Sequence, residues 1–187
     1  MRNSVGGFRM SRKGDWEMKI WMPRDIKCAT LFNTVCNVSE EDAIAFSGIS
    51  ENRLFTWKNL GWITEEHDEK KSWYRTTIKG REIFEEKTLI HPYVSNSYRH
   101  DKGLFDIYAS KSDSERDSWL TESELRMYAS ERDIDLTDMS VTDGAYRNDN
   151  GDLVCVEIIT ISYSDEDKAM KERFVEEIGG QYATYKI

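Results

Sequence analysis

Residues 39–87 read SEEDAIAFSGISENRLFTWKNLGWITEEHDEKKSWYRTTIKGREIFEEK, and this stretch decides the expected fold of the first half of the chain. Ser39 and Ser50 are residue types that cap the start of a helix, while Gly48 and Gly61 are typical helix stops. Three apolar residues recur at helical spacing in the second segment: Leu54, Trp57 and Leu60. The pattern predicts two short helices joined by a turn of about three residues, the helix-turn-helix layout.

The residues on both sides of this helix pair complete a small unit. Pro23 opens a predicted helix over 23–36, because proline suits the first helical turn. After Gly61, WITEEH and SWYRTT are typical of two strands around the polar turn DEKKS. Thr77 then caps a last helix, IKGREIFEEK. In order and spacing these segments resemble the winged-helix family from Pro23 to Lys87.

The resemblance implies binding of double-stranded DNA through the second short helix. Such a helix presents polar side chains to base edges, where arginine suits guanine and asparagine suits adenine. Basic residues at the hairpin and in the closing helix are candidates for phosphate contacts. The predicted DNA-contacting residues are Asn52, Arg53, Thr56, Lys58, Lys70, Lys71, Lys79 and Arg81. The alternative is a protein-docking module with ordinary solvated side chains, because acidic residues at the hairpin repel phosphate.

The net charge of the 187-residue chain is −9, and it is unevenly distributed. Residues 1–37 hold seven Lys or Arg against three Asp or Glu, residues 38–90 eight against eleven, and residues 91–187 eleven against twenty-one. Because a local patch rather than the total charge contacts phosphate, a DNA-binding first half is compatible with this balance. The acidic second half predicts a protein partner.

Composition favours a cytoplasmic protein with no membrane segment. No stretch approaches the ~20 consecutive apolar residues of a membrane helix. The N-terminus is basic but has no apolar segment behind it, which argues against a signal peptide, and we expect a flexible basic arm over residues 1–22. Cys28, Cys36 and Cys155 lack the paired spacing of structural zinc ligands, so we expect reduced, buried thiols.

Residues 91–187 predict a small α/β domain after the winged helix of residues 23–90, which makes the chain α+β overall. Asn150-Gly151 is a strong hairpin signal between two strands. The expected elements are a helix ending near residues 110–112, a helix over 118–133, strands over 140–146 and 152–163, a helix over 164–180 and a strand over 181–187.

Three acidic residues in this domain follow a recognisable order. Asp143 belongs to the first strand, Glu157 lies in the middle of the second, and Glu122 or Glu124 lies on the helix before them. This order resembles the restriction-endonuclease-like fold, whose carboxylates hold a divalent metal for phosphodiester hydrolysis. The resemblance implies Mg²⁺ as cofactor, with Glu122, Asp143 and Glu157 as catalytic candidates and Asp143 and Glu157 as metal ligands.

Longer motifs extend the resemblance. Arg99-His100-Asp101, then WLTESELR, TDGAY and VCVEIITIS, resemble the replication-relaxation family of plasmid and mobile-element proteins, which joins a winged helix to such a nuclease-like domain. Thr142 replaces the usual proline, and Ile159 and Tyr163 stand where the family has an acid or a lysine. No Lys or Arg lies between Gly151 and Asp167. The missing positive charge predicts a degenerate, inactive domain.

These observations predict sequence-directed binding of double-stranded DNA by a plasmid, conjugative-element or phage protein that acts in replication, mobilisation or transcription regulation. A homodimer is compatible with this function, because many helix-turn-helix proteins dimerise on paired half-sites. One alternative is a Mg²⁺-dependent nuclease or nicking accessory that uses Asp143 and Glu157. The other is an acidic interaction protein or phage inhibitor that does not bind DNA.

Overall fold

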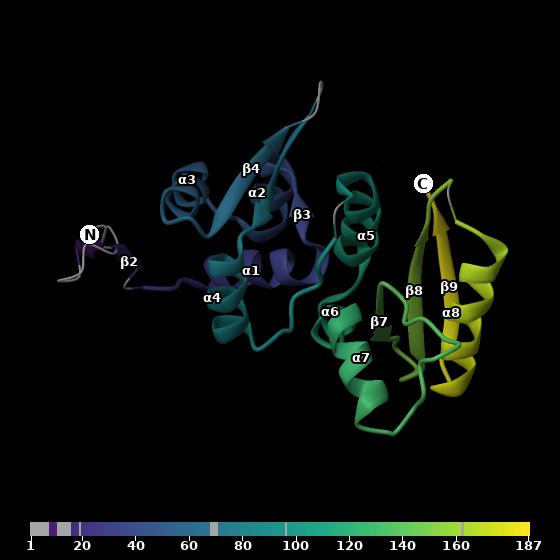
Figure 1. The fold of residues 1–187 in the computed structure, drawn as a ribbon. Helices are drawn as coiled ribbons and strands as arrows, with labels where there is room; N and C mark the ends of the chain where they lie inside the picture. The colour runs from purple at the N-terminus through teal and green to yellow at the C-terminus, as the bar shows by residue number, and fades with distance from the viewer. Residues whose placement is uncertain (1–7, 11–15, 19, 68–70, 96, 162) are drawn as a thin grey trace.

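The computed structural model describes residues 8–10, 16–18, 20–67, 71–95, 97–161 and 163–187, and its fold is mixed α+β (Figure 1). The helices are α1 (Pro23–Val35), α2 (Glu40–Ser47), α3 (Glu51–Asn59), α4 (Ile78–Thr88), α5 (Tyr98–Ser110), α6 (Asp113–Asp117), α7 (Glu122–Ser130) and α8 (Asp165–Glu177). The strands are β1 (Phe8–Met10), β2 (Trp16–Met18), β3 (Asn37–Val38), β4 (Ile63–His67), β5 (Ser72–Thr76), β6 (Leu120–Thr121), β7 (Gly144–Arg147), β8 (Leu153–Ile159) and β9 (Gln181–Lys186). Within the described ranges, no helix is long and apolar enough to cross a membrane.

The N-terminal unit consists of α1 to α4 and a three-stranded antiparallel sheet in the order β3-β5-β4. The predicted pair of short helices, the hairpin and the closing helix are all confirmed. Ser39 Oγ accepts a hydrogen bond from the Asp42 amide at the start of α2, and Gly48 ends that helix in the left-handed conformation. Strand β3 was not predicted, because two residues between helices carry no alternation from which a strand can be inferred.

Gly80 explains how closely α4 packs on the backbone of Trp62, directly before strand β4 of the hairpin. A Cβ atom at this position would lie 1.8 Å from the carbonyl oxygen of Trp62. The close approach places Phe84 of α4 against the aromatic side chains at the centre of the N-terminal unit, with the Trp57 and Phe84 ring centroids 4.8 Å apart. Trp57 is fully buried, which confirms its predicted place in the core.

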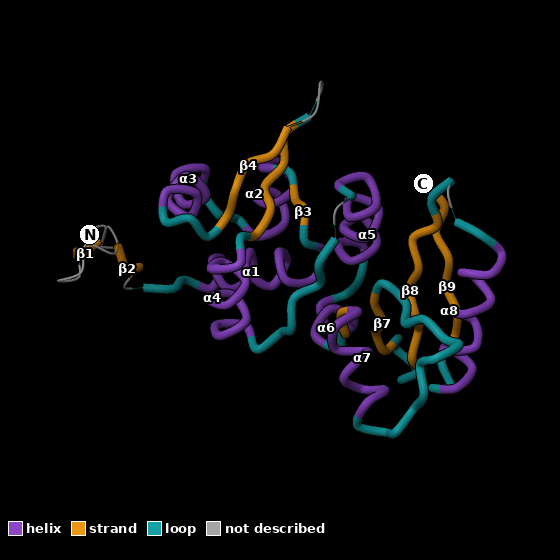
Figure 2. The backbone as a smooth tube through the Cα atoms, in the orientation of Figure 1, coloured by secondary structure: helices purple, strands orange, loops and turns teal. Residues whose placement is uncertain are grey.

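The C-terminal unit is built on a four-stranded sheet in the order β6-β7-β8-β9, antiparallel except for the parallel pair β8–β9. Val154, Val156 and Ile158 of β8 belong to the core that includes α5, whereas Leu153 and Cys155 belong to the core that includes α8. The period-two alternation of a strand therefore places α5 and α8 on opposite faces of the sheet (Figure 2).

Several boundaries in the C-terminal unit differ from expectation. The helix expected over 118–133 begins only at Glu122, because Leu120 and Thr121 pair with β7 as strand β6. Strand β7 begins at Gly144 rather than at residue 140, since its pairing with β6 and β8 begins at this residue. The Trp119 ring packs on Gly144, where a Cβ atom would approach it to 2.8 Å. A short helix, α6, lies in the segment between the helices expected to end near residue 112 and to begin at residue 118.

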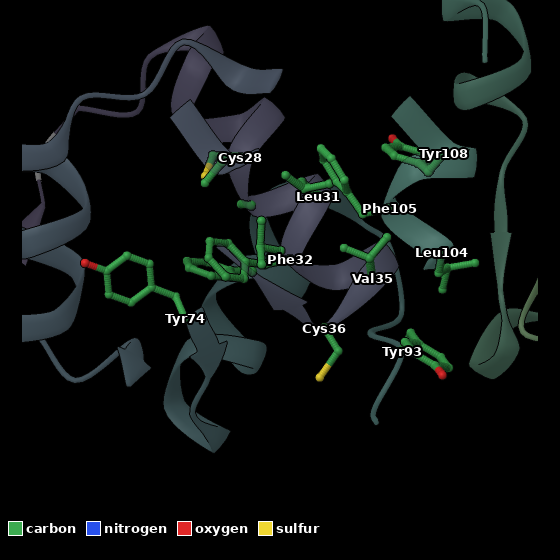
Figure 3. Close-up of a cluster of buried hydrophobic side chains, with 14 of the residues drawn as sticks. Cys28, Leu31, Phe32, Val35, Cys36, Tyr74, Tyr93, Leu104, Phe105 and Tyr108 are labelled. Carbon is green, nitrogen blue, oxygen red and sulfur yellow. The ribbon is translucent and has the colours of Figure 1, made fainter. Parts of the chain in front are cut away.

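One hydrophobic core runs through both units. Leu31 and Val35 of α1 face Leu104 and Phe105 of α5, and these side chains gather in one cluster (Figure 3). The same cluster continues to β8. Packing is thus shared across the boundary expected between residues 90 and 91. Figure 1 shows α5 between the N-terminal unit and the four-stranded sheet.

The expected arm over residues 1–22 contains two strands that the sequence did not predict. They are β1 and β2, which pair in antiparallel orientation. Of the basic residues assigned to this arm, Arg2, Arg12 and Lys13 lie outside the described residues.

The three cysteines are free and buried, as predicted. Burial raises the pKa of the Cys28 thiol to about 12 and that of Cys155 to about 11.

Candidate functional site

Helix α3 presents one face to solvent because its other face is part of the core. Leu54 and Trp57 are fully buried, and the residues on the opposite side are exposed. At 100° per residue the exposed positions form one continuous face. They are Glu51, Asn52, Phe55, Lys58 and Asn59.

Arg53 lies at the edge of this helix and points back to α1. Its Nε lies 3.0 Å from Asp25 Oδ1, and its Nη2 lies 2.6 Å from Asp25 Oδ2 and 2.7 Å from the Ile20 carbonyl oxygen. Asp25 is fully buried and also accepts a hydrogen bond from the Met22 amide at the start of α1. Arg53 is therefore the counter-ion of a buried carboxylate, and its planar fork is used within the protein.

Three of the other residues expected to contact DNA also have partners within the chain. Lys58 forms an ion pair with Glu65 of β4 at the surface. Lys79 Nζ donates to the Leu60 carbonyl oxygen at 3.1 Å. Thr56 Oγ1 donates to the Asn52 carbonyl oxygen at 2.8 Å.

The remaining predicted contacts are placed as follows. The Asn52 side chain is exposed, and Arg81 is half-buried. Lys71 Nζ lies 5.9 Å from the centroid of the Tyr98 ring. Lys70 lies outside the described residues.

Acidic residues border the α3 face on the side of α2. A shallow depression between the two helices has Ile44 and Ala45 in its lining, together with Glu40, Glu41 and Glu51. Carboxylates at this position repel phosphate, so this side of the helix pair disfavours a nucleic-acid backbone.

The second candidate site is a buried polar cluster at the start of β7. Asp143 Oδ2 accepts a hydrogen bond from the Ile158 amide at 2.7 Å and lies 3.0 Å from His100 Nε2. The Asp143 backbone amide donates to Glu157 Oε2 at 3.3 Å, and Lys171 Nζ lies within 4.0 Å of both carboxylates, so the two predicted residues do lie together. The structure brings His100 of α5 to them, whereas Glu122 of α7 pairs with Arg126 on its own helix.

Lys171 of α8 supplies a positive charge that the sequence of β8 lacks. Its Nζ lies 2.8 Å from Glu157 Oε2 and 4.0 Å from Asp143 Oδ1. Tyr163 donates a hydrogen bond to the other oxygen, Glu157 Oε1, at 2.9 Å. The expectation that this site has no cation was therefore wrong, because it considered only the strand and its nearest loop. The sequence of α8 does carry a sign of this contact. Lys171 lies three residues before the buried Phe174, so both side chains are on the helix face that packs on the sheet.

The acidic and basic groups of the cluster shift each other's ionisation. Burial opposes the charged form of His100, but hydrogen bonds and charges from Asp101 and Asp143 outweigh it and raise its pKa to about 10. Burial and the charge of Asp143 raise the pKa of Glu157, although Lys171 and Tyr163 act in the opposite direction. His100 is thus held as an imidazolium between two carboxylates at neutral pH.

As arranged, the cluster does not fit a Mg²⁺ site. His100 and the Ile158 amide engage Asp143, and Lys171 and Tyr163 engage Glu157. In the part of the chain that the structure describes, no three His, Cys, Asp or Glu side chains are grouped to hold a metal ion. Asp143 and Glu157 are each already paired with a cationic side chain of the protein, rather than open to a metal ion.

No protein-family model, curated protein or solved structure matches the chain.

Proposed function

We propose that residues 23–90 are a winged-helix domain and that the protein binds double-stranded DNA through it. The observation that carries the proposal is the arrangement of α2 and α3, which are joined by the three residues 48–50 and followed by the β4–β5 hairpin and α4. Helix α3 would enter the major groove with its exposed face, as the second helix of this motif does. The proposed setting is replication, mobilisation or transcription regulation in a mobile element, on the resemblance stated above.

Within this proposal, Asn52 and Lys58 carry the contacts from α3. Asn52 is exposed and has the geometry to bind adenine. The partner of Lys58 among the described residues is Glu65, and this exposed ion pair is worth little in free energy and is readily exchanged for a phosphate. Arg53 is assigned to the fold instead, because its removal would leave Asp25 buried and unpaired.

The test is binding of labelled duplexes of random and mobile-element sequence at ~50 and ~200 mM salt, the range over which phosphate contacts become apparent. We expect binding that weakens steeply with salt and that Lys58→Ala reduces. Lys168→Ala is the matched control, because Lys168 also forms an exposed pair with a glutamate but lies on α8. Absence of binding at the lower salt concentration would reject the proposal and favour an acidic interaction protein.

For the C-terminal unit we propose a partner-binding role without catalysis. The support is the neutralised state of Asp143 and Glu157, not the lack of a lysine, since Lys171 is present. Incubation of supercoiled plasmid with the protein and millimolar Mg²⁺ or Mn²⁺ tests this, and we expect the plasmid to stay intact. Cleavage that Glu157→Gln abolishes would assign the nuclease alternative instead.

A further inference from the structure

The exposed face of α3 has a large apolar side chain at its centre. Phe55 is 61% exposed. Glu51, Asn52, Lys58 and Asn59 surround it at three or four residues' distance, so they are its neighbours on the helix surface. A single exposed ring framed by polar groups is a much smaller apolar area than the patches of a few hundred Å² that mark protein interfaces.

The side chains on this face of α3 differ from those of a helix that recognises guanine through arginine. Arginine bound bidentately to guanine is the commonest base contact, and Arg53 is the only arginine of α3. Because Arg53 is bound to Asp25 and the Ile20 carbonyl, the arginine contact is absent from the face. This leaves Lys58 as the one cation among the exposed residues of α3. The face offers the amides of Asn52 and Asn59, the ammonium of Lys58, the carboxylate of Glu51 and the Phe55 ring.

We propose that Phe55 makes α3 select thymine, with its ring against the C5-methyl group in the major groove. This methyl is the apolar feature that a base pair displays on its major-groove edge, and phenylalanine is among the side chains that contact it. Asn52 lies beside the ring and suits adenine, while Glu51 suits the amino group of cytosine. The expected site thus has an A·T pair where Phe55 contacts it. This inference rests on the proposed DNA binding and names the base that the helix reads.

The closing experiment separates the two proposals. Duplexes are selected from a random pool with the wild-type protein, and the best one is synthesised with thymine or with 2′-deoxyuridine, which keeps pairing and charge but lacks the methyl. We expect affinity to fall about fourfold for each contacted thymine, the effect of one buried methyl group. Phe55→Ala should bind both duplexes equally, while Met127→Ala, at a half-exposed apolar position on α7, should discriminate like the wild type.

Three outcomes of this experiment would overturn the inference, and each has a different meaning. If the wild type selects no duplex, the proposed DNA binding is rejected, and the proposed recognition of thymine by Phe55 is rejected with it. If it selects a duplex but binds the deoxyuridine form equally well, DNA binding stands and the role of Phe55 is overturned. If Phe55→Ala weakens both forms alike and also abolishes self-association in sedimentation, Phe55 serves contacts between protein copies, and the inference is overturned.

Discussion

His100 Nε2 lies 3.0 Å from Asp143 Oδ2, and this contact joins α5 to the start of β7 across 43 residues of sequence. On the other side of the ring, Nδ1 lies 3.2 Å from Asp101 Oδ1. Asp101 Oδ2 accepts hydrogen bonds from the amide of Asn37 at 3.1 Å and from its side-chain nitrogen at 2.6 Å. A line of polar groups therefore connects the residues after α1 with the four-stranded sheet, through the region where the two units share their core.

The first prediction concerns the dependence of stability on pH. The pKa of His100 is raised from 6.5 to about 10, so the folded state binds this proton more tightly than the unfolded state does. The resulting stabilisation is complete below about pH 6.5 and is lost as the pH rises through about 10. We expect the free energy of unfolding, measured in urea, to fall over this window, and His100→Gln to flatten the fall.

The comparison with His100→Gln isolates this residue from other groups that titrate in the same direction. The raised pKa values of Glu157 and of the buried thiols also favour the folded state at lower pH, but they are present in both proteins. Equal slopes in the wild type and in His100→Gln would show that the imidazolium contributes nothing to the pH dependence.

The second prediction concerns Arg53 and Asp25. Removal of one partner of a buried ion pair leaves a charge without compensation and costs roughly 3 kcal/mol, so Arg53→Ala should lower the free energy of unfolding by about that amount. Lys58→Ala breaks an exposed pair and should change stability by less than about 1 kcal/mol. A fully stable Arg53→Ala protein that has lost DNA affinity would return Arg53 to the DNA-contacting set.

The third prediction uses the close approach at Gly80. Because a Cβ atom there would lie 1.8 Å from backbone rather than from a movable side chain, Gly80→Ala must separate α4 from Trp62. We expect a loss of several kcal/mol, in the range of severe core overpacking, seen as a much lower thermal midpoint. Gly151→Ala is the comparison, since nothing surrounds that position and only its φ of +83° opposes alanine. Similar losses in both variants would contradict a packing role for Gly80.

The sequence predicted elements that carry local signals and missed those that depend on pairing in space. Ser39, Gly48 and Thr77 mark helix ends by their own chemistry, and the structure places caps and stops at these residues. Strands β3 and β6 are two residues long and exist only because β5 and β7 lie beside them. No local pattern reveals such strands.

The same distinction holds for the candidate sites. The meeting of Asp143 and Glu157 followed from their positions on neighbouring strands. The contacts of Lys171 and Arg53 did not, because each side chain reaches across to a different element, and a single sequence gives no direct signal for such a pair. Arg53 thus illustrates that a residue type suited to guanine can serve a buried carboxylate instead.

The last prediction concerns Lys171, whose ammonium offsets the buried charge of Glu157. Lys171→Met removes a group that lowers the pKa of Glu157, so this pKa should rise further above its ordinary value of 4.5. When folding raises the pKa of an acid, the folded protein becomes less stable as the pH rises, because ionisation of that acid is disfavoured in the folded state. The variant should therefore be destabilised by roughly 3 kcal/mol near pH 8 and by much less near pH 5. Urea unfolding at both pH values measures the difference.

Lys168→Met, which loses an exposed pair on the same helix, should show little effect at either pH. Glu157→Gln combined with Lys171→Met should recover most of the loss at pH 8, because no buried charge is left unpaired. An equal cost of Lys171→Met at both pH values would mean that Lys171 stabilises the fold by packing alone.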